Sequence, residues 1–350
     1  MIFNNKSPVG IISYGSKIPK NRISGEQIAK NQGKEKQKIY QSLGVYSKSV
    51  PSKDEDTITI SVAAGFQALD RLKKLSNKDI RSQLGSLFIG SESHPYAVKP
   101  TGTVVAQALG ISSDSYINSQ GEGFYKSLAL ADLQFACKAG TQALQISSIY
   151  VNSDFTNYAM AIGADTAQAK RGDVLEYTAG AGGAAFIVGK NESQFLAKII
   201  ATTSVATDTP DFWRRPKEDH PEHAGRFTAN PGYFRHILMV VNQILNETKI
   251  KIEEIDYFVF HTPNAKFPMT IAKKLGIDKR KIEPSLLVKN IGNTYAGASM
   301  LGLVSTLDLI EENKKILIAS YGSGSGSDAF IIETTDKLIS ARKKWNNEKN

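Results

Sequence analysis

KIEEIDYFVFHTPN, residues 251–264, contains an apolar run that stops at His261. A short run rich in aromatic residues, followed by Thr-Pro-Asn, is typical of a buried strand that ends in a tight turn. SLFIGSES, residues 86–93, has the same form and reaches Glu92 just after its apolar run. One local pattern therefore occurs in both halves of the chain.

The order of elements after these two strands is also repeated. A helical stretch finishing in Leu-Gly-Ile follows each strand, at 109–111 and at 275–277. Alternation of strands and helices indicates an α/β fold, and self-similarity indicates a duplicated unit. Each half then has an Ala-Gly pair opening a helix, CKAGTQAL (137–144) or TYAGASML (294–301), and a strand-rich close, AMAIGADT (159–166) or KILIASYGSGSGSDAF (315–330).

We therefore predict an α/β protein made of two pseudo-repeated halves, residues 1–191 and 192–336, followed by a basic, solvated tail at 337–350. Each half would build one sheet, and the halves would pack around a pseudo-twofold axis. Such packing brings equivalent strand and helix ends of the two halves together. The polar residues that would meet at this shared centre are Glu92, Cys137, His261 and Asn293.

The composition predicts an ordinary soluble globular protein. Of 350 residues, 41% are hydrophobic and 22% are charged. No apolar run approaches the roughly 18 residues that span a bilayer. The N-terminus reaches its first strand too soon for a signal peptide, so we expect a cytoplasmic protein. One cysteine rules out an internal disulfide and a Cys-rich zinc site.

The formal charge of +9 is compatible with nucleic acid, anionic lipid or an acidic small molecule. The lysines of the chain are scattered, and the densest basic patches, at 34–38 and 342–349, are typical of solvated surface. No nucleic-acid motif accompanies the charge. We expect neither a nucleic-acid nor a membrane partner, whereas a phosphate-bearing substrate fits.

Cys137 begins a helix among small residues. Unpaired N–H groups and the helix dipole at such a position favour the thiolate, although a lone cysteine is as often a buried structural residue. His261 at its strand end is by itself more often structural than catalytic. If its ring reaches Cys137, the two would form the Cys–His pair used in acyl transfer.

Asn293 and Glu92 have plain and functional interpretations. Asn293, in a glycine-bounded loop before a helix, suits a helix cap, or a donor that polarises a carbonyl. Glu92 suits a solvated loop carboxylate, or a general base tuned by a water-poor pocket.

The glycine-rich stretch YGSGSGSDAF, residues 321–330, lacks the signs of a nucleotide site. It precedes a strand rather than opening a helix, and no P-loop lysine follows. We predict a tight strand-to-strand turn. The amides of Gly322 and Ser323, with that of Cys137, are candidates for an oxyanion hole.

Taken together, the motifs resemble the archaeal-type 3-hydroxy-3-methylglutaryl-CoA (HMG-CoA) synthase family of the thiolase superfamily. The motifs occur in family order and cover nearly the whole chain. They are YGSKIPKNRI (14–23), KSVPSKDEDTITI (48–60), GSESHPYAVKPT (90–101), FACKAGTQALQ (135–145), PDFWRR (210–215), GRFTANPGYF (225–234), FHTPNAKFP (260–268), NIGNTYAGASMLGL (290–303) and YGSGSGSDAF.

The resemblance implies a thiolase-like fold with a layered αβαβα core, and an acyltransferase of the mevalonate route to isoprenoids. Cys137 would accept an acetyl group from acetyl-CoA, and Glu92 would deprotonate the acetyl methyl for attack on acetoacetyl-CoA. His261 would orient and protonate the acetoacetyl oxygen, assisted by Asn293. Hydrolysis would release HMG-CoA, with no metal and no permanently bound cofactor.

The resemblance also implies the binding residues. Lys266 and Arg226 match positions near the phosphates of coenzyme A, while Thr178 and Thr228 match positions facing the substrate. Arg214 and Arg215 are possible extra contacts. Three positions depart from the family pattern: Thr262 and Ala265 replace an expected glutamine and glycine, and Thr270 replaces an expected basic residue.

Partners follow from the same resemblance: a homodimer, and a complex with an acetoacetyl-CoA thiolase and a small OB-fold protein. The segment 112–127 is longer than the family usually carries and would cover the site or contact a partner. Two alternatives stay open. One is a β-ketoacyl-ACP synthase III-like enzyme, which needs no base at Glu92, and the other is a non-catalytic acyl-CoA-binding scaffold.

Overall fold

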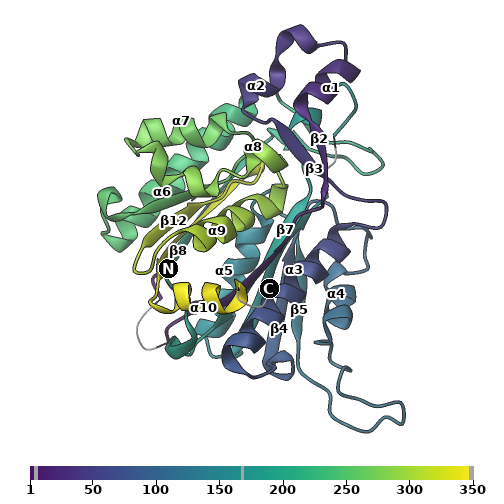
Figure 1. Ribbon diagram of the computed structural model, residues 1–350, viewed down its shortest axis with the longest axis vertical. Coiled ribbons are helices and arrows are strands. Elements are labelled where there is room, and N and C mark those ends of the chain that lie inside the picture. The colour runs from purple at the N-terminus through teal and green to yellow at the C-terminus, as the bar shows by residue number, and fades with distance from the viewer. Residues whose placement is uncertain (4–6, 167–168, 347–350) are drawn as a thin grey trace.

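The computed structural model describes residues 1–3, 7–166 and 169–346 and is mixed α/β (Figure 1). Its first half contains strands β1 Gly10–Lys17, β2 Asn21–Ser24, β3 Ser47–Val50, β4 Leu84–Gly90, β5 Ala129–Leu133, β6 Tyr158–Asp165 and β7 Gly182–Gly189, with helices α1 Gly25–Asn31, α2 Ile39–Leu43, α3 Thr57–Ser76, α4 Thr101–Leu109 and α5 Ala139–Asn152. The rest contains β8 Ala197–Thr209, β9 Phe212–Trp213, β10 Glu222–His223, β11 Tyr257–Phe260, β12 Lys315–Ala319 and β13 Gly324–Thr334, with α6 Phe234–Thr248, α7 Lys266–Leu275, α8 Val288–Ile291, α9 Ala298–Leu309 and α10 Lys337–Asn346.

The strand order repeats the duplication seen in the sequence. One nine-stranded sheet runs β11-β12-β13-β8-β1-β7-β6-β4-β5. Outward from its middle, β8-β13-β12-β11 mirrors β1-β7-β6-β4, with the same sequence of two antiparallel pairings and one parallel pairing. The expectation of a separate sheet for each half is wrong in one respect. Strands β8 and β1 pair at two positions, Gly10 with Lys198 and Ile11 with Ala197, and so join the halves edge to edge.

Three apolar clusters fill the spaces between the layers. The central cluster joins α5 and α9 to strands of both halves, including β4, β6, β7, β12 and β13. A second cluster packs α3 and α4 on the outer face of the first half, and a third packs α6 and α7 on the outer face of the second. This is the layered αβαβα core that the sequence predicted, with α5 and α9 as its middle layer.

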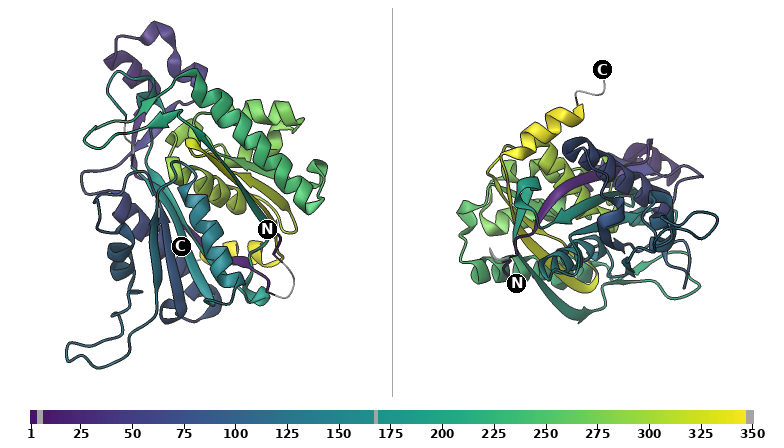
Figure 2. Two further views of the ribbon diagram at one scale, coloured as in Figure 1. Left: turned by 180° about the vertical axis from the view of Figure 1, so that it is seen from behind. Right: turned by 90° about the horizontal axis from the view of Figure 1, so that it is seen from below.

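Within the described residues, the C-terminal segment is not the solvated tail expected from its charge, and positions 347–350 of that expected tail lie outside the described residues. Residues 337–346 form α10, the yellow helix in the right-hand view of Figure 2. Trp345 is 6% exposed, lies edge-on to Tyr14, and donates from its indole N–H to the carbonyl of Arg71 at 3.2 Å. Leu338 and Ala341 are buried in the same central apolar cluster, so three apolar side chains anchor a helix that is otherwise strongly basic.

The long segment 112–127 does not cover the site. It forms an arm at the bottom of the molecule, visible in Figure 1 and in the left view of Figure 2. The rings of Tyr116 and Phe124 stack within it at 5.0 Å. The arm joins the end of α4 to the start of β5, whereas the site lies where β4, β5 and β6 finish, so the arm extends from the opposite end of the sheet. Among the described helices, none is long and apolar enough to cross a membrane.

Candidate active site

Cys137 lies in a tight turn between β5 and α5. Ala136 occupies the left-handed region at φ 43°, which is costly for a residue with a side chain. The amide of Lys138 donates to the carbonyl of Phe135 at 3.2 Å, and that of Ala139 donates to Ala136 at 3.0 Å. Cys137 is 8% exposed. The turn therefore presents the thiol at the amino end of α5, as the sequence predicted.

Glu92 lies next to Cys137, and each side chain affects the pKa of the other. Glu92 follows β4, and burial, with the nearby Asp165, raises its pKa to about 8, while the interaction with Cys137 and the charge of Arg214 oppose that rise. Its Oε1 is buried with no hydrogen-bond partner among the described residues. A carboxyl with a pKa close to neutrality and a free buried oxygen suits a general base.

The thiol of Cys137 is not shifted toward thiolate. Burial raises its pKa well above the usual range, and the charges of Glu92 and Asp165 add to the rise. Burial and the nearby carboxyls thus move the pKa of the free thiol in the direction opposite to the one that a helix N-terminus favours.

Asp165, at the end of β6, is a central residue that the sequence analysis missed. Its Oδ1 accepts from the amide of Glu92 at 2.8 Å and from the amide and hydroxyl of Ser93 at 3.0 and 2.6 Å. The hydroxyl of Ser91 also donates to Oδ1, and the amide of Ala296, from the other half, donates to Oδ2 at 2.8 Å. An acid closing the apolar run AMAIGAD was the available signal, the same one that singled out Glu92.

His261 follows β11 and is held by its backbone. Its amide donates to Ala319 at 3.0 Å, and its carbonyl accepts from the hydroxyl of Tyr233 at 2.6 Å. Burial lowers the pKa of the ring to about 3, so the imidazole is neutral. Its Nδ1 is buried and has no partner within the described part of the chain. Among the groups that raise the pKa of the Cys137 thiol is Glu92, and His261 is not one of them.

Asn293 has the local structural role that was expected of it. Its Oδ1 accepts from the amide of Tyr295 at 2.9 Å, which fixes the carboxamide and directs its NH₂ group away from that contact. Its amide donates to the carbonyl of Thr178 at 2.6 Å, and its carbonyl accepts from Gly180 at 2.8 Å. Tyr295 and Cys137 share one small apolar cluster. Asn293 is thus a local cap with a free donor group.

The Gly/Ser loop, residues 320–326, is the predicted turn between β12 and β13. Gly322 and Gly326 exchange two backbone hydrogen bonds of 2.8 Å. The amide of Gly322 is thereby engaged, contrary to expectation, and the amide of Ser323 is left as this loop's candidate oxyanion donor. Buried Asp211 holds the loop through the amide of Gly324 at 2.8 Å and the hydroxyl of Tyr321 at 2.5 Å.

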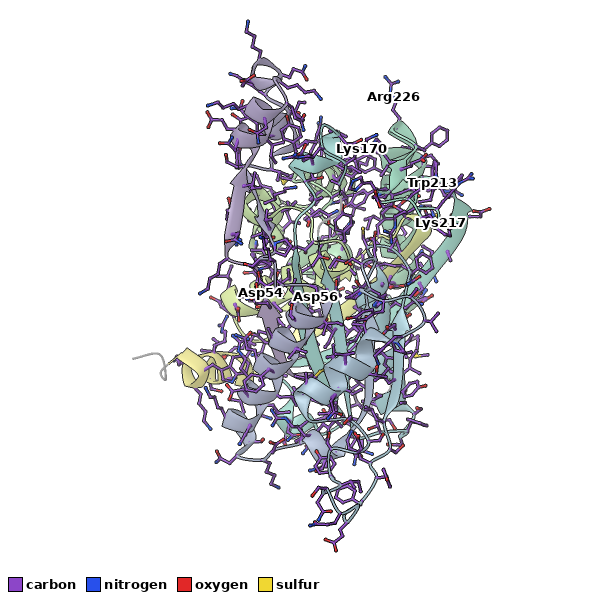
Figure 3. The ribbon with its side chains drawn as sticks, turned by 90° about the vertical axis from the view of Figure 1, so that its right-hand side faces the viewer. Asp54, Asp56, Lys170, Trp213, Lys217 and Arg226 are labelled. Atoms are coloured by element: carbon purple, nitrogen blue, oxygen red, sulfur yellow. The ribbon has the colours of Figure 1, made fainter. Side chains whose placement is uncertain are left out.

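A cavity of ≈ 260 Å³ opens beside Glu92. One side of the cavity is formed by the acidic residues Glu92 and Asp165, and the other by the segment that follows Asp211. Its lining residues are Ser91, Glu92, Ser93, Gln134, Ala136, Asp165, Thr166, Phe212, Trp213, Arg214, Pro221 and Tyr295. Figure 3 labels Trp213 at the upper end of the molecule, together with the exposed cations Lys170, Lys217 and Arg226.

The remaining predicted binding residues lie outside this lining. Lys266 opens α7 and is exposed, and Thr270 donates its hydroxyl to the carbonyl of Lys266 at 2.9 Å. The hydroxyl of Thr228 donates to the carbonyl of Asp211 at 3.1 Å. Arg215 is exposed, whereas its neighbour Arg214 lines the cavity.

The gain in stability of the Glu92→Gln variant over wild type should become larger as the pH rises. The folded-state pKa of about 8 lies above the ordinary value of 4.5, so between these values the folded protein binds more protons than the unfolded chain. Stability is therefore lost with increasing pH in this window, and Glu92→Gln removes that loss. Thermal melts of both proteins at pH 6 and pH 9 measure the effect. A difference in Tm that is the same at both pH values would contradict it.

A layered α/β fold of two pseudo-repeated halves, with Cys137 at the start of a helix and Glu92 beside it, is typical of a thiolase-fold acyl-condensing transferase. The chain belongs to the hydroxymethylglutaryl-CoA synthase family, as its motifs predicted. It is 49% identical over 330 residues to hydroxymethylglutaryl-CoA synthase of Archaeoglobus fulgidus, covering 94% of this chain and 90% of that protein. The enzyme of the same name from Thermococcus onnurineus is 47% identical over 95% of this chain and 89% of its own length.

Other comparisons agree on the fold. Residues 245–334 match the family described as 3-oxoacyl-[acyl-carrier-protein] synthase III C terminal. An HMG-CoA synthase solved with CoA superposes with a TM-score of 0.83 at 22% identity, over 98% of this chain and 86% of that one. The 3-oxoacyl-(acyl carrier protein) synthase III of Pseudomonas aeruginosa PAO1 gives 0.81 at 14% identity, over 94% and 99%.

Proposed function

We propose that this protein condenses acetyl-CoA with acetoacetyl-CoA and water to give HMG-CoA and CoA through an acetyl-Cys137 thioester. The proximity of the Cys137 thiol to the Glu92 carboxyl, beside a cavity that opens to the surface, is the observation that carries the proposal. An acetyl group on the Cys137 sulfur would place its methyl beside Glu92. A nucleophile and a base in such contact are what a condensation on an enzyme thioester requires.

In the first step the Cys137 sulfur attacks the acetyl carbonyl and CoA leaves, carrying away the thiol proton. The amides of Cys137 and Ser323 stabilise the tetrahedral oxyanion. Splitting the reaction in this way produces a thioester held next to its base.

In the second step Glu92, as carboxylate, removes a proton from the acetyl methyl. The resulting enolate attacks the ketone carbon of acetoacetyl-CoA. The neutral ring of His261 orients that ketone by hydrogen bonding, assisted by the NH₂ of Asn293. As the oxygen becomes an alcohol it takes a proton from this ring, and the ring regains a proton from Glu92, which holds the one removed from the methyl group. Water then cleaves the Cys137 thioester, which yields a free carboxylate and restores the thiol.

Coenzyme A would enter from the end of the molecule that carries Trp213. The exposed cations Lys170, Lys217 and Arg226 gather there, and they match a ligand bearing several phosphates. Arg226 and Lys266 are assigned to the coenzyme, while Thr178 and Thr228 face the acyl portion. No residue of the proposed chemistry calls for a metal or a resident cofactor.

We also propose a homodimer that joins an acetoacetyl-CoA thiolase and a small OB-fold protein in the cytoplasm, because acetoacetyl-CoA is then passed on directly. Strand β5 supports the dimer, since it lies at one end of the sheet and its one strand neighbour there is β4. Sedimentation of the protein alone, and then with both partners, tests these associations. A monomer that shifts with neither partner would contradict them.

The proposed function is tested by weighing the intact protein after incubation with acetyl-CoA. One acetyl group should appear and should be discharged by acetoacetyl-CoA with formation of HMG-CoA. The match at 245–334 keeps a synthase III-like activity as the second candidate, and turnover of malonyl groups without use of acetoacetyl-CoA would favour it. Absence of any adduct, alone and with the partner proteins, would favour the scaffold.

A further inference from the structure

The residue after the nucleophile forms a buried ion pair with the other half of the protein. Nζ of Lys138 lies 2.9 Å from Oδ1 of Asp328 on β13, and the two side chains are 4% and 0% exposed. Such a pair is weak evidence of stability, because removing two charges from water offsets most of their attraction. A function in fixing geometry is therefore the better explanation of its presence one residue from Cys137.

Further hydrogen bonds fix the pair in place. Oδ1 of Asp328 also accepts from the hydroxyl of Ser204 at 2.8 Å, and Oδ2 accepts from the hydroxyl of Thr141, in the first turn of α5, at 3.0 Å. Nζ of Lys138 lies 4.2 Å from the centre of the Phe135 ring, the residue that opens the Cys137 turn. The carboxylate thus holds α5, the Cys137 turn and β13 together.

The side chain of Lys138 runs directly beneath the Gly/Ser loop. A Cβ on Gly322 would overlap the carbonyl oxygen of Phe135 and lie 2.8 Å from Cγ of Lys138, and one on Gly326 would lie 2.6 Å from the Phe135 ring and 3.0 Å from Cε of Lys138. A side chain at either position would collide with these residues, so glycine allows the close approach. The loop therefore rests on Phe135 and Lys138 together, and its distance from the Cys137 turn depends on where these two residues are held.

We propose that the Lys138–Asp328 pair positions the Gly/Ser loop against the Cys137 turn, and so sets the separation of the Cys137 and Ser323 amides that bind the thioester oxyanion. The inference rests on the proposed function. Lys138 and Asp328 are positioning residues, since neither touches the reacting atoms. An oxyanion hole assembled from both halves needs such a link, because the loss of a few tenths of an ångström in alignment weakens hydrogen bonds to a developing charge.

Direct activation of the thiol by the Lys138 charge is the competing explanation, and the structure disfavours it. The charge is matched by Asp328 at hydrogen-bond distance. The charged groups that affect the pKa of Cys137 are Glu92, Asp165 and Asp211, and all three raise it.

The test uses Lys138→Met, Asp328→Asn and the double variant. Each variant should load acetyl from acetyl-CoA about 10- to 100-fold more slowly than wild type, which is less than the loss that follows deletion of a whole oxyanion donor. The KM for acetyl-CoA should stay within about threefold of the wild-type value. The double variant should be no slower than the slower single variant, because the residues act as one unit. In the acetyl-enzyme made with [1-¹³C]acetyl-CoA, the infrared carbonyl stretch should move toward that of a free thioester.

Tyr14→Phe is the matched control. It removes another hydrogen bond between the halves, from the Tyr14 hydroxyl to Asp308 at 2.7 Å, away from the Cys137 turn. It should lower the melting temperature and leave the carbonyl stretch unchanged. If Lys138→Met fails to fold, Asp328→Asn, which keeps the shape of the side chain and one of its two acceptor oxygens, answers the question. Wild-type loading rate and carbonyl stretch in a folded variant would overturn the inference, whereas failure of wild type to accept acetyl would overturn the proposed function itself.

Discussion

Glu92→Gln should retain the acetyl adduct and lose condensation. Loading depends on the Cys137 sulfur and on the oxyanion donors, and none of these is changed by the substitution. Condensation needs a base for the methyl proton, and a carboxamide cannot accept it. General-base catalysis contributes about 10²- to 10⁴-fold, so HMG-CoA formation should fall by about that factor.

Intact mass and product assay, made on the same sample, measure the two steps separately. The variant should carry a full acetyl group that persists after acetoacetyl-CoA is added. Glu122→Gln, the same change on the arm remote from the cavity, should match wild type in both assays. Condensation at the wild-type rate in Glu92→Gln would show that Glu92 is not the base for condensation. Loss of the adduct would show that Glu92 acts in the loading of acetyl onto Cys137.

The pH dependence of condensation should follow the same carboxyl. Because burial raises the pKa of Glu92 to about 8, its basic form accumulates only as the pH rises toward that value. The deep position of the carboxyl therefore gives a base strong enough to remove a methyl proton, at the cost of being partly protonated near neutrality.

Local patterns predicted the elements and where they end. Strand β4 ends at Gly90 and β11 at Phe260, so Glu92 and His261 occupy the strand ends assigned to them. The duplication predicted that residues from both halves meet, and the hydrogen bond between the amide of Ala296 and Asp165 is one such meeting. These features follow from periodicity and chain order, which a single sequence displays.

Features that depend on partners distant in the chain could not be predicted. Nothing near Lys138 indicates that its partner is Asp328, and nothing near Asp165 indicates that it gathers amides from two loops. The helix dipole is a local argument and predicted a thiolate at Cys137, but burial among acids is a tertiary property and reverses it. The basic charges of the C-terminal stretch are likewise visible in the sequence, whereas the burial of Leu338, Ala341 and Trp345, which anchors this stretch as a helix, depends on distant partners.

Cys137→Ala should abolish both the adduct and HMG-CoA formation. The methyl group of alanine cannot attack a thioester, and without a tethered acetyl group Glu92 has no substrate to deprotonate. Loss of a nucleophile that forms a covalent intermediate lowers turnover by about 10⁴-fold or more. The variant should still fold, because it leaves a small space beside Ala179 and Tyr295 and removes no packed core side chain.

The single cysteine makes the same residue measurable by chemical labelling. Because the pKa of Cys137 is raised, alkylation by iodoacetamide should be slow at pH 7, should accelerate as the pH rises, and should be blocked by prior acetyl-CoA. Cys137→Ala provides the unlabelled control. Rapid labelling at pH 7 would show that the thiolate exists in the free protein, and an acetyl adduct on Cys137→Ala would show that another residue is the nucleophile. If both results come out as expected, the Cys137 thiol stays protonated beside Glu92 in the free protein and reacts only once the acyl donor has entered the pocket.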